Sequence, residues 1–336
     1  MLSKDEKLYI NEHYVSWKPG KFRYWESLPN LDAADPQERV WAQQSKDKPA
    51  LVFIHGYAAS IEHWREAFKS LRGRYRMYGL DLLGFGYSEK LPGSKVNYSA
   101  DLWAKQIRDL VAHKDEERVI LVGHSMGGMA AIQCALNYPE RVQALVLVDS
   151  SGLPDQGKLE VEALNQERKV KRPGFDMLMF NALSAPLLGE AAALAMSASA
   201  WAARAGLEQA YWDKRKVTPQ LVEQFHAPLR TPGAAFSYLA VTRNFTKFQL
   251  PLKSGDLKLP TLIMWGEHDR AMKPEIMLPQ WQKLIPQAEV YLVKDAAHCP
   301  QDEKPDDLNA RLTEFVEQQI ALGKSATSTH ERLPRI

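Results

Sequence analysis

Short runs of apolar residues alternate with segments of helical periodicity along most of the chain. Five continuous apolar runs have the length of strands that are covered on both faces of a parallel sheet. They occupy residues 51–54, 120–122, 144–148, 262–264 and 290–293. Between them, apolar residues recur at helical spacing, as at Trp64, Phe68 and Leu71, and a later stripe runs from Leu308 to Ile320. This alternation predicts an α/β fold with a mostly parallel central sheet and helices on both of its faces.

The two ends of the chain depart from this alternation. Residues 14–17 and 21–25 flank the turn signal Pro19-Gly20 and predict a β-hairpin. The polar stretch 29–49 is expected to be a connecting loop, and the polar residues 323–336 a flexible C-terminal tail. The first residues carry charges but no apolar run, so we expect no secretory signal and a cytoplasmic protein.

Residues 151–249 differ in composition, because they are rich in Ala, Leu and Met and favour helices. Strand–helix alternation lies on either side of them. We therefore predict a core formed by residues 1–150 and 250–322, with a helical cap, residues 151–249, inserted into it. A membrane-spanning helix over the weakly charged stretch 177–203 would bury Glu190 in hydrocarbon. Buried or interfacial helices are expected there instead.

Composition limits the classes of function. Of the 336 residues, 45% are apolar and 25% are charged, the balance of an ordinary globular protein. Lys and Arg number 43 against 41 Asp and Glu, so no strong positive field is present to attract nucleic acid. The two cysteines, Cys134 and Cys299, provide neither a disulfide framework nor the spacing of a metal site.

A candidate nucleophile follows the second buried run. Residues 123–127 read G-H-S-M-G, a G-x-S-x-G sequence, and a helical stretch follows it. In this strand–turn–helix setting the serine occupies a sharp turn that exposes its hydroxyl. Glycines are needed where the strand and the helix approach closely. We therefore predict Ser125 as the nucleophile, with Gly123 and Gly127 as the elbow glycines.

Two backbone N–H groups are expected to form an oxyanion hole. Where this motif occurs, one donor is the residue after the nucleophile, here Met126, and the other comes from the loop after an earlier strand. That loop reads His55-Gly56-Tyr57, and Tyr57 is the expected donor. His55 is expected to brace the loop through a hydrogen bond rather than to take part in catalysis.

A serine hydroxyl needs a histidine to accept its proton and a carboxylate to orient that histidine. Of the nine histidines, only His298 follows a buried strand and lies C-terminal to the other candidates, as the chain order Ser–Asp–His requires. Asp269, in the loop after the fourth run, is the predicted acid. Asp149, at the end of the third run, is the alternative acid, and Glu267 and Asp295 are further alternatives.

Together these motifs resemble the α/β-hydrolase superfamily. The similar stretches are H-G-Y at 55–57, G-H-S-M-G-G at 123–128, W-G-E-H-D at 265–269 and A-A-H-C-P at 296–300. Residues 81–88 resemble the D-x-x-G-x-G-x-S segment of the branch that contains epoxide hydrolases, dehalogenases and C–C hydrolases, and nearby loops resemble chlorophyll dephytylases. Epoxide hydrolases and haloalkane dehalogenases use an aspartate nucleophile, whereas Ser125 stands there in this chain. The resemblance implies the α/β-hydrolase fold and a serine esterase-like or lipase-like activity.

The predicted reaction is hydrolysis of a carboxylic ester through a Ser125–His298–Asp269 triad and an acyl-enzyme intermediate. It requires neither a metal ion nor an organic cofactor. Because the cap should roof the nucleophile, part of its apolar surface is expected to line the pocket and to accept an apolar acyl or alcohol group. The residues considered for this lining are Met177, Leu178, Met179, Phe180, Leu183, Leu187, Leu188, Leu194, Met196, Trp201 and Tyr211.

Two other functions stay open from the sequence. A hydrolase that cleaves a C–C bond in a β-diketone-type substrate would use the same triad, and a ligand sensor with slow turnover would keep the same fold. The expected partner is a small apolar ester and not nucleic acid. Contact of the cap with a membrane or lipid surface is a further alternative. The sequence specifies neither the acyl chain nor the oligomeric state.

Overall fold

The structure is a computed structural model that describes residues 6–30, 35–45, 48–154, 188–244 and 248–330. The described residues form an eight-stranded sheet with the strand order β1-β2-β4-β3-β5-β6-β7-β8. The strands are β1 Asn11–Val15, β2 Phe22–Ser27, β3 Ala50–Ile54, β4 Met77–Leu80, β5 Val119–His124, β6 Val142–Val148, β7 Thr261–Gly266 and β8 Glu289–Val293. Strands β3 to β8 pair in parallel, whereas β2 is antiparallel to both β1 and β4. The prediction of a mostly parallel α/β sheet is confirmed.

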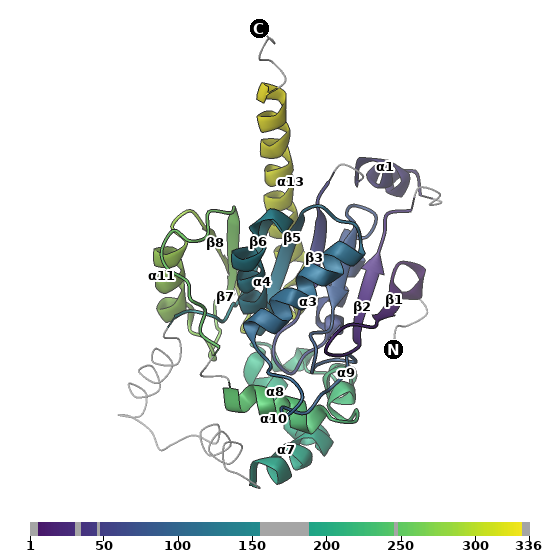
Figure 1. The fold of residues 1–336 in the computed structure, drawn as a ribbon, viewed down its shortest axis with the longest axis vertical. Coiled ribbons are helices and arrows are strands. Elements are labelled where there is room, and N and C mark those ends of the chain that lie inside the picture. Colours follow the sequence, from purple (N-terminus) through teal and green to yellow (C-terminus); the bar gives the residue numbers. More distant parts are fainter. Residues whose placement is uncertain (1–5, 31–34, 46–47, 155–187, 245–247, 331–336) are drawn as a thin grey trace.

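Helices cover both faces of this sheet (Figure 1). They are α1 Pro36–Gln44, α2 Arg65–Leu71, α3 Ala100–His113, α4 Met126–Asn137, α7 Leu188–Ala198, α8 Ala200–Ala210, α9 Pro219–Leu229, α10 Ala234–Asn244, α11 Pro274–Leu284, α12 Pro300–Glu303 and α13 Pro305–His330. Short 3-10 turns are η1 Glu6–Leu8, η3 Ile61–Trp64, η4 Pro139–Arg141 and η5 Lys214–Lys216. Buried side chains of α3, α4 and α11 join one apolar cluster, and those of α2 and α13 join another.

Side chains along the central strands alternate between these two clusters. In β3, Val52 and Ile54 belong to the cluster with α3 and α4, whereas Leu51 and Phe53 belong to the cluster with α2 and α13. Successive side chains of a strand point to opposite faces, so both faces of β3 are covered. This is why the strand reads as a continuous apolar run rather than as an alternating one.

The structure contains a strand that was not predicted and a helix in a stretch that was expected to be a loop. Strand β4 has only four residues and includes Gly79, where an added Cβ would lie 3.1 Å from the Ile61 side chain. Helix α1 lies within the stretch that was expected to be a loop. Its start is marked by Asp35, whose side chain accepts a hydrogen bond from the Gln37 N–H, and by Pro36 in the first turn.

The structure of the two ends of the chain agrees with one prediction and differs from another. The expected hairpin is present, with β1 and β2 paired so that Val15 lies opposite Phe22. Helix α13 continues to His330, so the described part of the expected tail, residues 323–330, is helical. Extending a helix that is already formed adds one hydrogen bond per residue and needs no new nucleus, and no proline interrupts this segment.

Helices α7 to α10 belong to the segment between β6 and β7 for which a cap was predicted, and they gather below the sheet in Figure 1. Residues 155–187, which include the candidates from Met177 to Leu187, lie outside the described residues. Within the described ranges, no helix has both the length and the apolar character needed to cross a membrane. The four helices pack over the end of the sheet where the candidate residues meet.

Candidate active site

Ser125 occupies a sharp turn between β5 and α4. Its backbone angles are φ 51° and ψ −119°, which a residue with a side chain rarely adopts. The turn is held on both sides, because the Ser125 N–H donates to the Val148 carbonyl oxygen (2.9 Å) and the Ser125 carbonyl oxygen accepts from the Ser151 N–H (3.1 Å). In this conformation Ser125 lines the cavity described below.

The two elbow glycines lie where backbone meets backbone. A Cβ added to Gly123 would lie 2.5 Å from the Gly127 carbonyl oxygen. A Cβ added to Gly127 would lie 2.4 Å from the carbonyl oxygen of Ile54, in β3. Neither obstacle is the end of a flexible side chain, so the turn has this shape only with glycine at both positions.

His298 and Asp269, from the loops after β8 and β7, form a hydrogen-bonded pair. The His298 Nδ1 lies 2.7 Å from the Asp269 Oδ2, while the Asp269 Oδ1 accepts from the N–H groups of Ala271 (2.8 Å) and Met272 (2.9 Å). Because a carboxylate only accepts, Nδ1 carries the imidazole proton and Nε2 is left as a proton acceptor.

Each member of this pair shifts the pKa of the other. Burial alone would raise the pKa of Asp269, but the His298 charge and the hydrogen bonds outweigh it and the pKa is lowered. Burial alone would lower the pKa of His298, but the Asp269 charge and its hydrogen bond outweigh it and the pKa is raised. Asp269 is therefore ionised, and His298 is a stronger base than an ordinary histidine.

His124, inside the elbow, also positions His298. The His124 Nε2 lies 2.6 Å from the His298 carbonyl oxygen and donates to it. The His298 N–H donates to the Ala210 carbonyl oxygen (3.0 Å), at the end of α8. Burial, reinforced by the nearby His298, lowers the pKa of His124 to about 3, so its ring is neutral. No role was predicted for His124 from the sequence, although its place beside the nucleophile was a signal.

The alternative acids do not take the place of Asp269. Asp149 is fully buried at the end of β6, and its Oδ1 accepts a hydrogen bond from the Gly266 N–H (3.0 Å). Asp295 is exposed, and its N–H donates to the Glu267 Oε2 (3.4 Å). In the described part of the chain, none of these three carboxyl groups bonds to the ring of His298.

The predicted oxyanion donors are Tyr57, which lines the cavity described below, and Met126, which directly follows Ser125. Within the described chain, neither the Tyr57 N–H nor the Met126 N–H takes part in a backbone hydrogen bond. Met126 begins α4, where unpaired N–H groups attract negative charge. The loop before Tyr57 is braced by His55, which donates from Nδ1 to the Gly56 carbonyl oxygen (2.7 Å) and accepts at Nε2 from the Leu82 N–H (3.0 Å).

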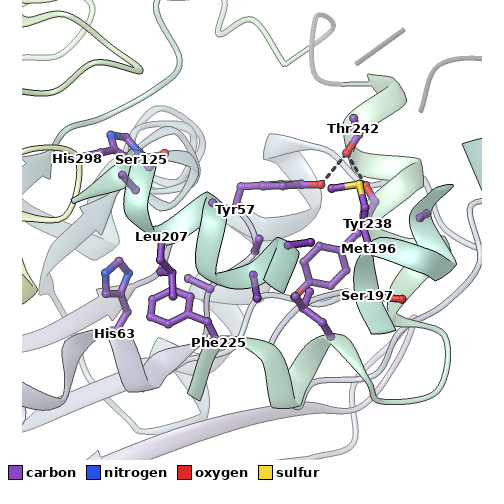
Figure 2. Close-up of a pocket in the computed structure, with 18 of the residues that line it drawn as sticks. Tyr57, His63, Ser125, Met196, Ser197, Leu207, Phe225, Tyr238, Thr242 and His298 are labelled. Carbon is purple, nitrogen blue, oxygen red and sulfur yellow. Dashed lines mark hydrogen bonds between the residues drawn. The ribbon is translucent and has the colours of Figure 1, made fainter. Parts of the chain in front are cut away.

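A cavity of about 410 Å³ lies between the loops that carry Ser125 and His298 and the helices α7 to α10 (Figure 2). Ser125, His298 and His63 lie at one end of it, and Met196, Ser197 and Thr242 at the other. Between them the wall is mostly apolar, with lining residues that include Ala203, Gly206, Leu207, Phe225, Leu229 and Leu239. At the far end the Tyr57 hydroxyl and the Thr242 Oγ1 are 2.6 Å apart and share a hydrogen bond.

Only some of the cap residues singled out from sequence reach this cavity. Met196 lines it. The side chains of Leu194 and Trp201 are 50% and 69% exposed and are not part of its lining. Tyr211 is buried and donates a hydrogen bond to the Asp302 Oδ2 (2.5 Å). The remaining candidates fall outside the described residues or, for Leu188, outside the described side chains.

His63 also lines the cavity, although it was not among the site residues predicted from the sequence. Its ring centroid lies 5.0 Å from that of His124 and 5.0 Å from that of Phe225. The Gln301 Nε2 lies 3.0 Å from its Nε2 and 3.2 Å from its Nδ1. Burial and the neighbouring His124 lower the pKa of His63, so the ring is neutral. A signal was its position just after the loop of the expected oxyanion hole.

Comparison with known proteins adds independent observations. The alpha/beta hydrolase fold family matches residues 49–305. Epoxide hydrolase 1 of Caenorhabditis elegans is 27% identical over 81% of this chain and 66% of its own length, so this chain spans about two thirds of that relative. Lipase 1 of Psychrobacter immobilis is 28% identical over 83% of this chain and 81% of its own length.

Among solved structures, a mutant of the meta-cleavage product hydrolase CumD aligns with a TM-score of 0.67 and 21% sequence identity. The alignment covers 91% of this chain and 98% of that one, and it shows a shared fold. The family match covers more than half of the chain and includes both the elbow and the His298 loop. This protein therefore belongs to the alpha/beta hydrolase fold family, and the prediction of a hydrolase is confirmed.

Proposed function

We propose that this protein is a serine hydrolase that cleaves carboxylic esters with an apolar acyl or alcohol group. The observation that carries the proposal is the arrangement of Ser125 and His298 at one end of a single cavity, with His298 Nδ1 hydrogen-bonded to Asp269. This bond leaves the His298 Nε2 as the atom that accepts a proton. The similarity to a protein named lipase supports the same class of reaction.

In the proposed reaction, His298 takes the proton of the Ser125 hydroxyl as the serine oxygen attacks the ester carbonyl. The N–H groups of Tyr57 and Met126 stabilise the resulting oxyanion, because neither is used by the backbone of the described chain. His298 then protonates the leaving alcohol, and an acyl-enzyme forms on Ser125. Water activated by His298 releases the acid and restores the serine.

The cavity lining supports an apolar substrate group. Its wall beyond the catalytic end consists mainly of alanine, leucine and phenylalanine side chains from α7 to α10. Burial of a hydrocarbon group against such a surface is favourable in proportion to the apolar area removed from water. We propose that these helices act as the cap over Ser125 and that this cavity holds the apolar group.

Labelling with a fluorophosphonate probe followed by peptide mapping tests the proposed nucleophile. We expect one adduct, on Ser125, and its loss in Ser125→Ala. Ser197→Ala is the matched control, because Ser197 lines the same cavity at the other end and should leave labelling unchanged. Folded wild-type protein without an adduct on Ser125 contradicts the proposal.

Turnover assays separate the ester reaction from its alternatives. We expect multiple turnovers of nitrophenyl esters by the wild type. Preferential cleavage of a vinylogous β-diketone would instead show that the protein is a C–C bond hydrolase. A single stoichiometric burst with no further product would instead support a slow ligand sensor.

A further inference from the structure

A second carboxyl group, that of Asp149, lies close to the Asp269–His298 pair. Asp149 follows β6 with a φ of 41°, and its side chain is fully buried. One carboxylate oxygen of Asp149, one of Asp269 and one ring nitrogen of His298 all lie within 4.8 Å of one another. The proposed ester mechanism uses Asp269 and His298 but gives Asp149 no role.

The two oxygens of Asp149 have different surroundings. Oδ1 accepts a hydrogen bond from the Gly266 N–H (3.0 Å), whereas Oδ2 is buried and has no donor among the described residues. A buried carboxylate oxygen without a donor is costly. If Oδ2 carries a proton, it becomes a donor itself, and the adjacent Asp269 carboxylate is its acceptor.

The surroundings decide which of the two carboxyl groups holds the proton. Asp269 accepts three hydrogen bonds, from the His298 ring and from two backbone N–H groups, and each favours its ionised form. Asp149 accepts one. Glu303 and Cys299 are further titratable groups that interact electrostatically with Asp149. Burial, and then the charge of Asp269, raise the pKa of Asp149 well above the ordinary 3.8.

We propose that Asp149 keeps a proton at neutral pH and donates it in a hydrogen bond to the Asp269 carboxylate. The role assigned to Asp269 rests on the proposed ester hydrolysis. Asp149 is then a positioning residue, because it acts on the reaction only through Asp269. Its hydrogen bond spreads the charge of Asp269 and so limits how far Asp269 raises the basicity of His298.

Two substitutions of similar size separate a proton donor from a space-filling side chain. Asp149→Asn keeps a neutral donor toward Asp269 and an acceptor for Gly266, so we expect kcat/KM for a nitrophenyl ester to stay within about threefold of wild type. Asp149→Leu removes the donor, and we expect kcat/KM to fall by about 10- to 100-fold. The acid limb of the pH profile of kcat/KM should also move to higher pH in Asp149→Leu. The reason is that the Asp269 charge, no longer shared with Asp149, raises the pKa of His298 further.

The proton can also be observed without catalysis. Infrared difference spectra should show the C=O stretch of a buried protonated carboxyl group at neutral pH, and this band should disappear in Asp149→Asn. Asp302→Asn is the control, because Asp302 is another buried carboxyl group and its substitution should leave the band of Asp149 in place. These measurements succeed or fail independently of ester turnover, so they distinguish this proposal from the proposed function.

Thermal unfolding provides a second measurement that does not need a substrate. Because the pKa of Asp149 is raised in the native state, its contribution to stability is complete below 3.8 and is lost as pH rises through the native pKa. The Tm of Asp149→Asn relative to wild type should therefore increase with pH. An unchanged difference, or a wild type without the infrared band, would overturn the proposal.

Two further outcomes would also contradict it. Asp149→Asn that loses as much kcat/KM as Asp149→Leu would show that a neutral donor is not what the site requires. A stoichiometric divalent ion in purified protein, lost on substitution of Asp149, would show that the three side chains bind metal instead. If Asp149→Leu does not fold, the infrared and Asp149→Asn measurements still decide the matter.

Discussion

The ring of His124 donates a hydrogen bond to the backbone of His298, with 2.6 Å between Nε2 and the carbonyl oxygen. His124 is the neighbour of Ser125 in the elbow, whereas His298 follows β8, 174 residues later in the chain. The ring centroids of the two histidines are 4.9 Å apart. The contact therefore links the turn that exposes the candidate nucleophile to the loop that carries its candidate base.

We expect His124→Phe to lower kcat while leaving KM nearly unchanged. Phenylalanine keeps a ring between His63 and His298 but has no donor for the His298 carbonyl, so the base loses a positioning contact. The expected loss is about tenfold, typical of one buried hydrogen bond. Steady-state kinetics on a nitrophenyl ester measure it, with His113→Phe, at an exposed position at the end of α3, as the control. Equal kinetics for both variants would contradict the positioning role.

The pH profile of the wild type should report the pair formed by His298 and Asp269. The base must be neutral, and the pKa of His298 is raised, so kcat/KM should rise with pH through an apparent pKa above 6.5. Asp269→Asn removes the charge that raises this pKa while burial persists, so the acid limb should move to lower pH. Turnover should fall by about 10⁴-fold because the imidazole is no longer oriented.

Asp295→Asn is the control for the pH profile, because Asp295 is exposed on the same side of the fold and does not bond to His298. It should reproduce the wild-type profile. If the acid limb of Asp269→Asn lies at the same pH as that of the wild type, or at a higher pH, the electrostatic role assigned to Asp269 is refuted.

A larger side chain at the far end of the cavity should restrict the enzyme to esters with shorter acyl chains. Ala193 lines the cavity on α7, one turn before Met196 and Ser197, which lie opposite the catalytic end in Figure 2. Ala193→Phe should lower kcat/KM for long-chain nitrophenyl esters by about 10- to 100-fold. It should leave the acetyl ester almost unaffected.

Leu194→Phe is the matched control for this series, since Leu194 is the next residue of the same helix and is 50% exposed outside the cavity. A uniform loss over all chain lengths in Ala193→Phe would indicate that the acyl group does not occupy this end.

Substitution by alanine should change the free energy of unfolding in opposite directions at two glycines. Gly123→Ala places a methyl group 2.5 Å from a backbone oxygen, so we expect the free energy of unfolding to fall by about 3 kcal/mol. Gly206→Ala, inside α8, meets nothing among the described residues within 4 Å. It should raise the free energy of unfolding by about 0.5–1 kcal/mol, because alanine favours a helix. Denaturant unfolding measures both, and a destabilised Gly206→Ala would show that its space is occupied.

Several features of this protein could be determined from local sequence. Continuous apolar runs such as 51–54 indicated strands covered on both faces, because burial on both sides excludes polar residues from either face. Ser125 and the two elbow glycines were identifiable from five consecutive residues, since strand, turn and helix are neighbours in the chain. Strand β4 escaped detection because four residues with a central glycine carry little periodic signal.

Tertiary structure alone decided how the chemistry is arranged. Asp149 and Asp269 follow neighbouring parallel strands, so sequence placed both near the histidine, and only the course of each loop determined which carboxylate meets His298. The roles of His63, His124 and Asp149 depend on contacts with segments more than a hundred residues away. A position beside a recognised motif draws attention to such a residue but does not reveal its distant partner. Hydrophobic spacing is set by nearest neighbours along one element, whereas hydrogen-bond partners and proton positions are set by whatever distant atoms the fold brings within reach.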